Sequence, residues 1–321
     1  MPDGRSVGPV RIFVAGGTGA IGRPLVTSLA AAGHEVTVFS RTEARVAALG
    51  VPGVVPAVGD ALDPGALLRA VQAARPEVVI NQLTSLPQSL NPLTAKRGFD
   101  ATSRLRRVVS GTLLAAARAA SARRVIAQSI SFAYRPGPGV RTEDDPLWTE
   151  AKGLIGTLSR SVAQLESATL GDDAVQGIVL RYGTFYGPGT YFASGGLYAS
   201  LLAKRRLPVP GNGGGLFGFV HVDDAAAATV AALEGPTGVF NVVDDVPAPA
   251  SEWMPMAARL LGVRPPRRVP EALVRIGPGQ FLAYLMCDQP AVSNQRARAE
   301  LGWAPARPDW HEALGATLTG A

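Results

Sequence analysis

Three glycines near the start of the chain have the spacing of a phosphate-binding turn. Gly16, Gly19 and Gly22 follow an apolar run over residues 11–15, and an apolar pattern of helical period begins at Ile21. A strand, a tight turn and a helix in this order place free N–H groups and the helix dipole where a pyrophosphate would lie. We predict that this turn binds a dinucleotide through Gly16, Thr18, Gly19, Ala20, Ile21 and Gly22.

The next expected strand, over residues 34–39, leads into Ser40 and Arg41. In a nucleotide-binding βαβ unit, an acid at this place binds the ribose 2′-hydroxyl, whereas a nearby arginine accommodates a 2′-phosphate. A guanidinium can pair with phosphate through two hydrogen bonds and can stack on adenine. Ser40 and Arg41 therefore favour NADP over NAD. In the alternative interpretation, Arg41 only begins the following helix.

Alternating strands and helices continue through the first half of the chain. Further strands are expected over residues 54–58, 78–81, 124–129 and 239–243, helices over 64–74 and 101–120, and a loop over 85–98. The carboxyl ends of parallel strands meet at one edge of a sheet, where ligands of doubly wound folds bind. We therefore add to the predicted cofactor site the residues that follow two of these strands: Asp60, Ala61, Leu83 and Thr84.

Composition and charge exclude several classes of protein. The chain of 321 residues is 47% apolar and 17% charged, with a net charge of +6 and a single cysteine, Cys287. The arginine clusters are not interleaved with aromatic residues, so we expect no nucleic-acid partner. No apolar run reaches the ~18 residues of a membrane span and the N-terminus lacks an apolar signal core, so a cytoplasmic location without membrane contact is expected. One cysteine permits neither an internal disulfide nor a cysteine cluster for a metal.

Several motifs in the second half of the chain resemble those of the extended short-chain dehydrogenases/reductases, which include sugar-nucleotide epimerases and dehydratases. The motifs occur in the family's order and extend the resemblance over nearly the whole chain: Ser129-Ile130-Ser131-Phe132-Ala133-Tyr134, Thr142-Glu143-Asp144-Asp145-Pro146, Leu180-Arg181-Tyr182-Gly183-Thr184-Phe185-Tyr186-Gly187-Pro188-Gly189, Phe219-Val220-His221-Val222-Asp223-Asp224 and the C-terminal stretch 293–303. The resemblance implies an α/β fold, a Rossmann-type doubly wound parallel sheet with a small C-terminal substrate-binding region.

The same resemblance implies a division of the chain. Residues 10–184 would bind the dinucleotide, with 217–245 returning to that domain, and residues 185–216 and 246–321 would form a substrate-binding lid region. Glycines between 192 and 215 suit a mobile lid. The resemblance also adds to the predicted cofactor site Arg160, Tyr182 and Thr184.

The family's acid/base pair, Tyr-x-x-x-Lys on one helix face, is missing from this chain. No tyrosine precedes any lysine by four residues, and the expected helix carries Gly156 and Arg160 at the two positions. Arginine can still hold ribose hydroxyls, but glycine has no proton to donate. Lys152, four residues after Trp148, imitates the spacing and is only a weak substitute because an indole is no proton donor of suitable pKa.

Other residues must therefore provide any hydroxyl chemistry. Ser129 or Ser131 could orient a substrate oxygen, and Tyr134 or Tyr186 could supply a relocated hydroxyl. Each tyrosine has the alternative of packing and bonding locally. His221, before two carboxylates, is expected to cap a helix rather than to act as a base.

These observations predict an NADP(H)-binding oxidoreductase that acts on a carbonyl, imine or alcohol of a small molecule. Because no general acid is present, an electrophilic substrate such as an iminium or a conjugated carbonyl is favoured. Two alternatives remain: a cofactor-binding sensor or scaffold without catalysis, and a non-redox isomerase, cyclase or epimerase. The expected partner is a small-molecule substrate, with a homodimer as a further option and no metal.

Overall fold

The protein is built on a seven-stranded parallel sheet, here seen in a computed structural model that describes residues 8–86, 92–276 and 279–320. Neighbouring strands pair in register, with Ile12 beside Val36 on one side and beside Val78 on the other. In sheet order the strands are β11 (Gly238–Val242), β6 (Gln176–Tyr182), β5 (Arg124–Ile130), β4 (Val78–Asn81), β1 (Arg11–Ala15), β2 (Glu35–Ser40) and β3 (Val55–Val58). This order and the flanking helices confirm the predicted doubly wound Rossmann-type fold.

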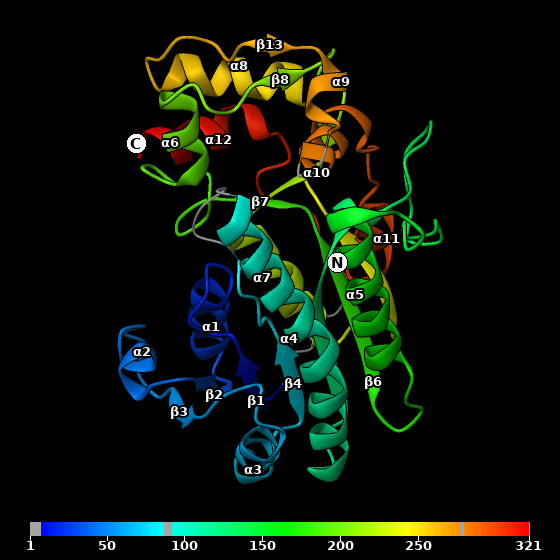
Figure 1. The fold of residues 1–321 in the computed structure, drawn as a ribbon. Helices are drawn as coiled ribbons and strands as arrows, with labels where there is room; N and C mark the ends of the chain where they lie inside the picture. The colour runs from blue at the N-terminus through cyan, green and yellow to red at the C-terminus, as the bar shows by residue number, and fades with distance from the viewer. Residues whose placement is uncertain (1–7, 87–91, 277–278, 321) are drawn as a thin grey trace.

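Helices cover both faces of the sheet (Figure 1). Alternate residues of β1 point to opposite faces, so Ile12 and Val14 pack with Leu25 of α1 (Gly22–Ala31) and with Ala225 of α7 (Val222–Ala231). Phe13 lies in a second core on the other face. The helices of that face are α3 (Pro64–Ala74), α4 (Pro92–Ala119) and α5 (Gly153–Leu170).

The helix α4 is longer at its start than the sequence indicated. The loop expected over residues 85–98 is wrong for 92–98, which are helical, while 87–91 fall outside the described residues. Pro92 is compatible with a helix start because the first turn needs no N–H donor there. The short helix α2 (Glu43–Ala47) follows β2 directly.

A smaller region lies beyond the carboxyl ends of the strands, at the top of Figure 1. It has its own buried aromatic core, which includes Phe217, Phe219, Trp253 and Trp310. Its helices are α6 (Leu197–Ala203), α8 (Ala250–Leu260), α9 (Glu271–Val274), α10 (Gln280–Ala283), the π-helix η3 (Tyr284–Asp288) and α12 (Trp310–Thr319), whereas α11 (Gln295–Glu300) packs against β11 of the main sheet. The predicted boundaries of the two domains stay a prediction.

Short strand pairs connect this region to the sheet. The parallel pair β7 (Thr184–Tyr186) and β10 (Phe219–His221) follows β6 and precedes α7. Two further pairs are β9 (Leu216–Phe217) with β12 (Ala248–Pro249), and β8 (Val209–Pro210) with β13 (Arg268–Val269). Residues 184–186 and 219–221 therefore lie between the nucleotide-binding sheet and the C-terminal region.

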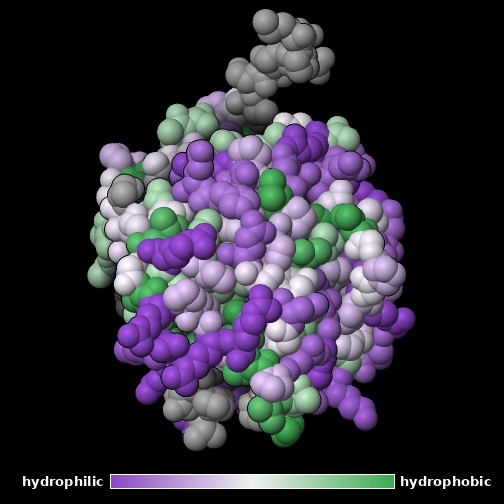
Figure 2. Space-filling view, turned by 90° about the horizontal axis from the view of Figure 1, so that it is seen from above, coloured by the Kyte–Doolittle hydropathy of each residue, from purple (hydrophilic) through white to green (hydrophobic). Residues whose placement is uncertain are grey.

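The surface of the C-terminal end is mixed in character. Seen from above, hydrophilic residues predominate and hydrophobic ones are scattered between them (Figure 2). Isolated surface hydrophobics of this kind need no partner. Within the described ranges, no helix has the length and apolarity needed to cross a bilayer, and no cluster of three or more His, Cys, Asp or Glu side chains is arranged to hold a metal ion.

Candidate active site

The turn between β1 and α1 has the geometry that its three glycines indicated. Gly16 has a φ of +92°, and a Cβ there would lie 2.6 Å from the carbonyl carbon of Gln82. A Cβ at Gly22 would overlap the carbonyl oxygen of Gly16 and lie 2.5 Å from the carbonyl carbon of Gly17. Gly19 is exposed, and its N–H donates to the Gly16 carbonyl over 3.1 Å. Positions 16 and 22 thus exclude side chains, while Gly19 leaves backbone open at the surface.

The start of α1 is free to receive an anion. Ile21 is the N-cap, no side chain caps the helix, and its first turn contains no acidic residue. Thr18 and Ala20 in the preceding turn are half-buried. Arg23 donates its N–H to the Gly19 carbonyl over 3.0 Å and Pro24 has no N–H, so the N–H groups just before Arg23, with the positive end of the helix dipole, are the ones that suit a pyrophosphate.

The residues after β2 and β3 lie on the same edge of the sheet as this turn, because all three strands run parallel. The backbone carbonyl of the buried Ser40 accepts from Gly59 over 3.0 Å, and Arg41 is exposed immediately after it. The exposed Asp60 accepts at Oδ1 from the N–H of Leu62 over 2.9 Å, and Ala61 beside it is buried. The structure therefore brings the predicted ribose and adenine positions to the edge where the glycine turn lies.

The residues after β4 and β6 extend this edge toward the C-terminal region. Leu83 donates its N–H to Asn81 Oδ1 over 3.2 Å, and both Leu83 and Thr84 are half-buried. Thr184 starts β7, and its N–H donates to the carbonyl of Gly218 over 2.7 Å. These three predicted cofactor residues therefore line up with the carboxyl ends of neighbouring strands.

Tyr182 is placed differently, inside the core between the sheet and α7. Thr229 donates its hydroxyl to the carbonyl of Ala225 over 2.9 Å, so its oxygen accepts from Tyr182 over 2.6 Å. Tyr182 in turn accepts from Gln82 Nε2 over 3.3 Å. Burial raises the pKa of Tyr182 to about 12. Its hydroxyl is therefore used within the protein, and the structure does not bring it to the cofactor edge.

Two of the four predicted catalytic residues belong to one buried polar network. Ser129 donates to Glu166 Oε1 over 2.7 Å, and Glu166 pairs with Arg181 through Nε at 2.8 Å and Nη2 at 2.7 Å. Arg181 also donates to the hydroxyl of Tyr134 over 2.7 Å, and that hydroxyl donates to Asn241 Oδ1 over 2.7 Å. The network ties β5, α5, β6 and β11 together, and both partners of its ion pair are nearly fully buried.

This network makes Tyr134 a poor source of tyrosinate. Burial raises its pKa to about 12, and the nearby Arg181 guanidinium offsets only part of that rise. The guanidinium also lies over the Tyr134 ring, 5.0 Å from its centre. At neutral pH the hydroxyl is therefore protonated and held in place, which is the opposite of a tyrosine activated for acid/base work.

The other two candidates, Ser131 and Tyr186, have hydroxyls without an aligned hydrogen bond to any described residue. Ser131 follows β5 in the 3₁₀ turn η1 (Ser131–Ala133), and its Oγ is buried near Gly218. Tyr186 is fully buried against the rings of Phe219 and His221, with centroids 6.0 and 5.1 Å away. Burial and the neighbouring Asp244 carboxyl raise the pKa of Tyr186 well above its usual range.

His221 has the capping role expected from the sequence. Its Nδ1 accepts from the N–H of Asp223 over 3.2 Å at the start of α7. Burial and the charge of Arg307 lower the pKa of His221. A Cβ at Gly187, whose φ is +111°, would lie 2.7 Å from His221 Nε2. A neutral imidazole that caps the helix and packs on the turn after β7 is not placed as a base.

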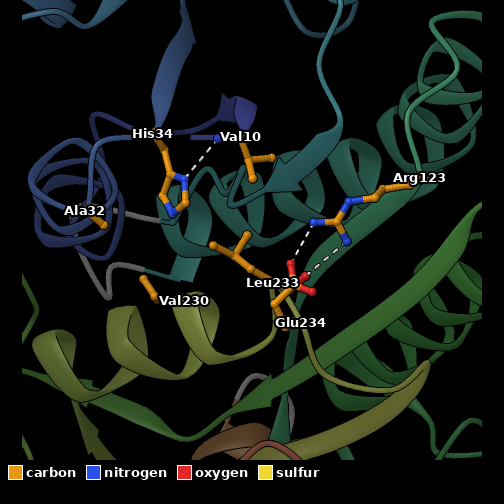
Figure 3. Close-up of a pocket in the computed structure, with 7 residues that line it drawn as sticks. All are labelled: Val10, Ala32, His34, Arg123, Val230, Leu233 and Glu234. Carbon is orange, nitrogen blue, oxygen red and sulfur yellow. Dashed lines mark hydrogen bonds and ion pairs between the residues drawn. The ribbon is translucent and has the colours of Figure 1, made fainter. Parts of the chain in front are cut away.

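A hollow of about 250 Å³ lies at the opposite edge of the sheet, before β1, β2 and β5 (Figure 3). His34 Nδ1 accepts from the N–H of Val10 over 3.3 Å, and Arg123 donates to Leu233 O over 3.4 Å and to Glu234 Oε1 over 2.7 Å. Its polar groups are thus paired with one another. Ligands of doubly wound sheets bind at the carboxyl edge, so this hollow is separate from the candidate site.

Comparison with known proteins agrees with the motifs and the sheet. A model of the NAD dependent epimerase/dehydratase family matches residues 12–242. The chain belongs to this family. It is 47% identical over 310 residues to a 3-diazoavenalumate denitrifying reductase from Streptomyces sp, covering 95% of this chain and 99% of that protein. The family and this relative confirm the prediction of an NAD(P)-dependent enzyme of the oxidoreductase or epimerase-like type.

Solved structures of the family share the fold over nearly the whole chain. The human epimerase family protein SDR39U1 with NADPH has a TM-score of 0.75 at 24% identity, covering 97% of this chain and 100% of that one. UDP-glucose 4-epimerase from Thermotoga maritima with UDP-glucose also has a TM-score of 0.75, at 20% identity, with coverages of 95% and 96%. At these identities the likeness shows the fold alone.

Gly156 and Arg160, the positions expected for the family's tyrosine and lysine, lie near the start of α5, where the preceding segment folds against the helix. A Cβ at Gly156 would overlap the carbonyl oxygen of Ala151 and lie 2.6 Å from its carbonyl carbon. The segment before α5 therefore occupies the space into which a tyrosine at 156 would have to extend. Arg160 Nη1 holds this segment by donating to Thr149 O over 2.7 Å and to Ala151 O over 3.2 Å.

The sequence missed three residues that organise the site. Glu166 and Arg181 form the buried ion pair, and Asp244 follows β11 with a nearly buried carboxyl beside Tyr186. Arg181 lies within the motif over residues 180–189, and Asp244 directly follows the strand expected over residues 239–243. Their places in the sequence could therefore have marked both as candidate site residues. Glu166 is one polar residue on a helix, and only the fold shows that it faces the sheet.

Proposed function

We propose that this protein is an NADPH-dependent reductase that replaces the diazo group of a small aromatic molecule by hydrogen. Two observations support the proposal: the absence of a proton donor at Gly156, where the preceding segment fills the space, and the 47% identity to a diazo-removing reductase. The first observation carries the argument, because it narrows the reactions that the site can perform.

Replacement of a diazonium group by hydrogen needs no proton from the protein. When bound, the reduced nicotinamide supplies a hydride, whose electron pair forms the new C–H bond, while the pair of the broken C–N bond leaves with N₂. The reaction balances as diazonium ion plus NADPH to arene, N₂ and NADP⁺. Reduction of a carbonyl, in contrast, also requires a proton on oxygen, and a general acid typically contributes about 10²–10⁴-fold to such a step.

The chain's own residues would bind the cofactor and orient the substrate in this reaction. The glycine turn and the start of α1 would hold the pyrophosphate, and Ser40, Arg41, Asp60 and Ala61 would hold the adenosine end, with Arg41 favouring the 2′-phosphate of NADPH. Leu83, Thr84 and Thr184 would border the rest of the cofactor. Ser131, whose buried hydroxyl has no partner among the described residues, would orient the reacting group.

The other predicted catalytic residues would support the site by holding its strands in place rather than by contacting the substrate. Ser129 and Tyr134 fix β5 through Glu166 and Arg181, and Tyr186 packs behind the turn after β7. We therefore expect Ser129→Ala to lower stability as well as kcat, whereas Ser131→Ala should lower kcat about tenfold with an unchanged Kd for NADPH. Ser167→Ala, on the exposed face of α5, is the matched control.

The test uses 4-hydroxybenzenediazonium and NADPH carrying deuterium at C4. Enzymatic reduction should transfer deuterium to the ring of the phenol and release one N₂ for each NADPH consumed, measured by mass spectrometry against a reaction without enzyme. Reduction of a panel of ketones and aldehydes without any reduction of the diazonium ion would overturn the proposal in favour of a carbonyl reductase.

A further inference from the structure

The segment that replaces the missing tyrosine also forms one wall of a small pocket. The pocket has a volume of about 240 Å³, with Trp148, Lys152 and Ile155 on one side and Arg275, Tyr284 and Asp288 on the other. It is smaller than the ~300–1,000 Å³ of sites for drug-sized ligands. A single aromatic ring with a short side chain matches its size.

The pocket is joined to the carboxyl end of the central strand β5. Tyr284 donates its hydroxyl to the backbone carbonyl of Tyr134 over 2.9 Å and approaches that of Phe132 at 3.3 Å. Both carbonyls come just after β5, at the edge of the sheet where the cofactor turn also lies. A ligand in this pocket therefore binds on the same side of the sheet as the dinucleotide.

Aromatic side chains provide a surface for a planar ligand. The rings of Trp148 and Tyr284 have centroids 5.4 Å apart and are tilted by 45°. Ile155 is buried beside them, whereas Trp148 is only half-buried and keeps part of its ring exposed. Ring-on-ring contact with such a partly exposed indole is favourable for a flat aromatic molecule.

The charges around the pocket leave one cation without a counterion. Arg275 donates through Nη2 to both carboxylate oxygens of Asp288, at 2.9 and 2.8 Å, and also pairs with Glu271. Lys152 is exposed and forms no ion pair with any residue in the described part of the chain. The first turn of α5, which begins next to Lys152, contains no acidic residue. The Lys152 ammonium is therefore available to pair with an anionic group of a ligand.

We propose that this pocket binds the carboxylate of a planar aromatic acid, with Lys152 paired to the carboxylate and the ring against Trp148. The inference rests on the proposed function, because it identifies the diazo-bearing substrate as an aromatic acid. The printed substrate name of the 47% identical relative is also that of an anion, 3-diazoavenalumate. A lysine paired with a carboxylate in a partly enclosed site provides both affinity and selection against uncharged analogues.

The test compares 4-hydroxycinnamate with its methyl ester, by calorimetric titration into enzyme saturated with NADP⁺. The acid should bind at least about tenfold more tightly than the ester. Lys152→Met, which keeps the side-chain stem and removes the charge, should abolish this difference, and Lys152→Arg should retain most of it. Lys204→Met, an exposed lysine after α6, is the matched control and should behave as wild type.

A second measurement separates this inference from the proposed function. Benzenediazonium has no carboxylate for Lys152 to bind, so its reduction by wild type tests the proposed reaction alone. If wild type selects the acid over the ester but reduces no diazonium ion, the pocket stands and the proposed reaction fails. Equal binding of acid and ester by wild type, or an unchanged preference in Lys152→Met, overturns the pocket.

Discussion

The turn after β1 and the start of α5 lie at the same edge of the sheet, and both depend on glycines without a side chain. In the turn the space is left open to a ligand, whereas at the start of α5 it is occupied by backbone. At Gly16 and Gly22 the absence of side chains lets backbone approach backbone, and the start of α1 stays open to a ligand. At Gly156 the absence of a side chain lets the carbonyl of Ala151 fold onto the helix. Glycine therefore leaves a helix start open to a ligand in one place and, in the other, allows backbone to occupy the position where the family's tyrosine is expected.

The difference separates the geometry expected for cofactor binding from the geometry expected for proton transfer. Binding of a dinucleotide depends on backbone geometry that tolerates no Cβ, and that geometry is intact. Proton transfer by the family's tyrosine depends on one hydroxyl, and at the position where that tyrosine is expected the carbonyl of Ala151 lies against Gly156. The proposed hydride transfer to a diazonium ion suits such a site, because it requires no proton from the protein.

The largest effect is expected from refilling position 156. Gly156→Ala should lower the free energy of unfolding by about 1–3 kcal/mol because the new Cβ overlaps the Ala151 carbonyl. Gly156→Tyr should destabilise at least as much and should not raise turnover. Thermal unfolding and steady-state kinetics with the diazonium probe measure both.

Gly111→Ala is the matched control for this prediction. Gly111 is also helical, in α4, and a Cβ there meets no atom within 4 Å, so alanine should stabilise the protein by up to about 1 kcal/mol. Equal shifts for the two alanine variants, or a gain in turnover by Gly156→Tyr, would show that the start of α5 is not closed as described.

The contrast between these two sites also marks what could be read from the sequence. The cofactor turn was predictable because Gly16, Gly19, Gly22 and the flanking apolar runs are neighbours in the chain, and short-range geometry determines their roles. The parallel, doubly wound sheet followed from the alternation of strands and helices. The loss of the tyrosine and lysine was equally visible as an absence at 156 and 160.

What replaces the pair was not predictable, because it depends on contacts between distant segments. Arg160 was expected to hold ribose, yet its Nη1 bonds to the segment before α5. Tyr182 was predicted to bind the cofactor, but its hydroxyl is hydrogen-bonded to Thr229, which lies 47 residues away in the chain. A local sequence pattern does not show which hydroxyl groups form hydrogen bonds within the folded protein. For this reason Ser129 and Ser131 were equivalent candidates in the sequence.

A smaller effect is expected on the cofactor side, at Arg41. Arg41→Asp should weaken binding of NADPH about tenfold or more relative to NADH, because a carboxylate repels the 2′-phosphate and accepts a hydrogen bond from a 2′-hydroxyl. Titration calorimetry with both cofactors measures the ratio. Arg45→Asp, an exposed arginine in α2 with the same change of charge, is the control. An unaltered ratio in Arg41→Asp would mean that Arg41 only precedes that helix.

The smallest expected effect concerns a buried carboxyl group, that of Asp244. Asp244 is 4% exposed beside Tyr186, and burial, together with the charges of Asp224, Asp245 and Asp309, raises its pKa from 3.8 to about 8, against a smaller opposing effect of the Tyr186 hydroxyl. The unfolded chain gives up this proton near pH 4. Between these values the folded state holds a proton that the unfolded state has lost, so the stability contributed by Asp244 falls as the pH rises toward about 8.

Asp244→Asn should remove this pH dependence without removing the side chain's volume. Between about pH 5 and pH 8, wild type loses the stability contributed by the protonated Asp244 carboxyl, whereas the amide of the variant does not titrate. We therefore expect the melting temperature of the variant, relative to wild type, to rise by several degrees over this range and then to level off. Asp173→Asn, at an exposed position before β6, also replaces a carboxylate by an amide, but at a site in contact with water, and should show no such trend. A constant difference between Asp244→Asn and wild type across this range would mean that the Asp244 carboxyl is already ionised in the folded protein.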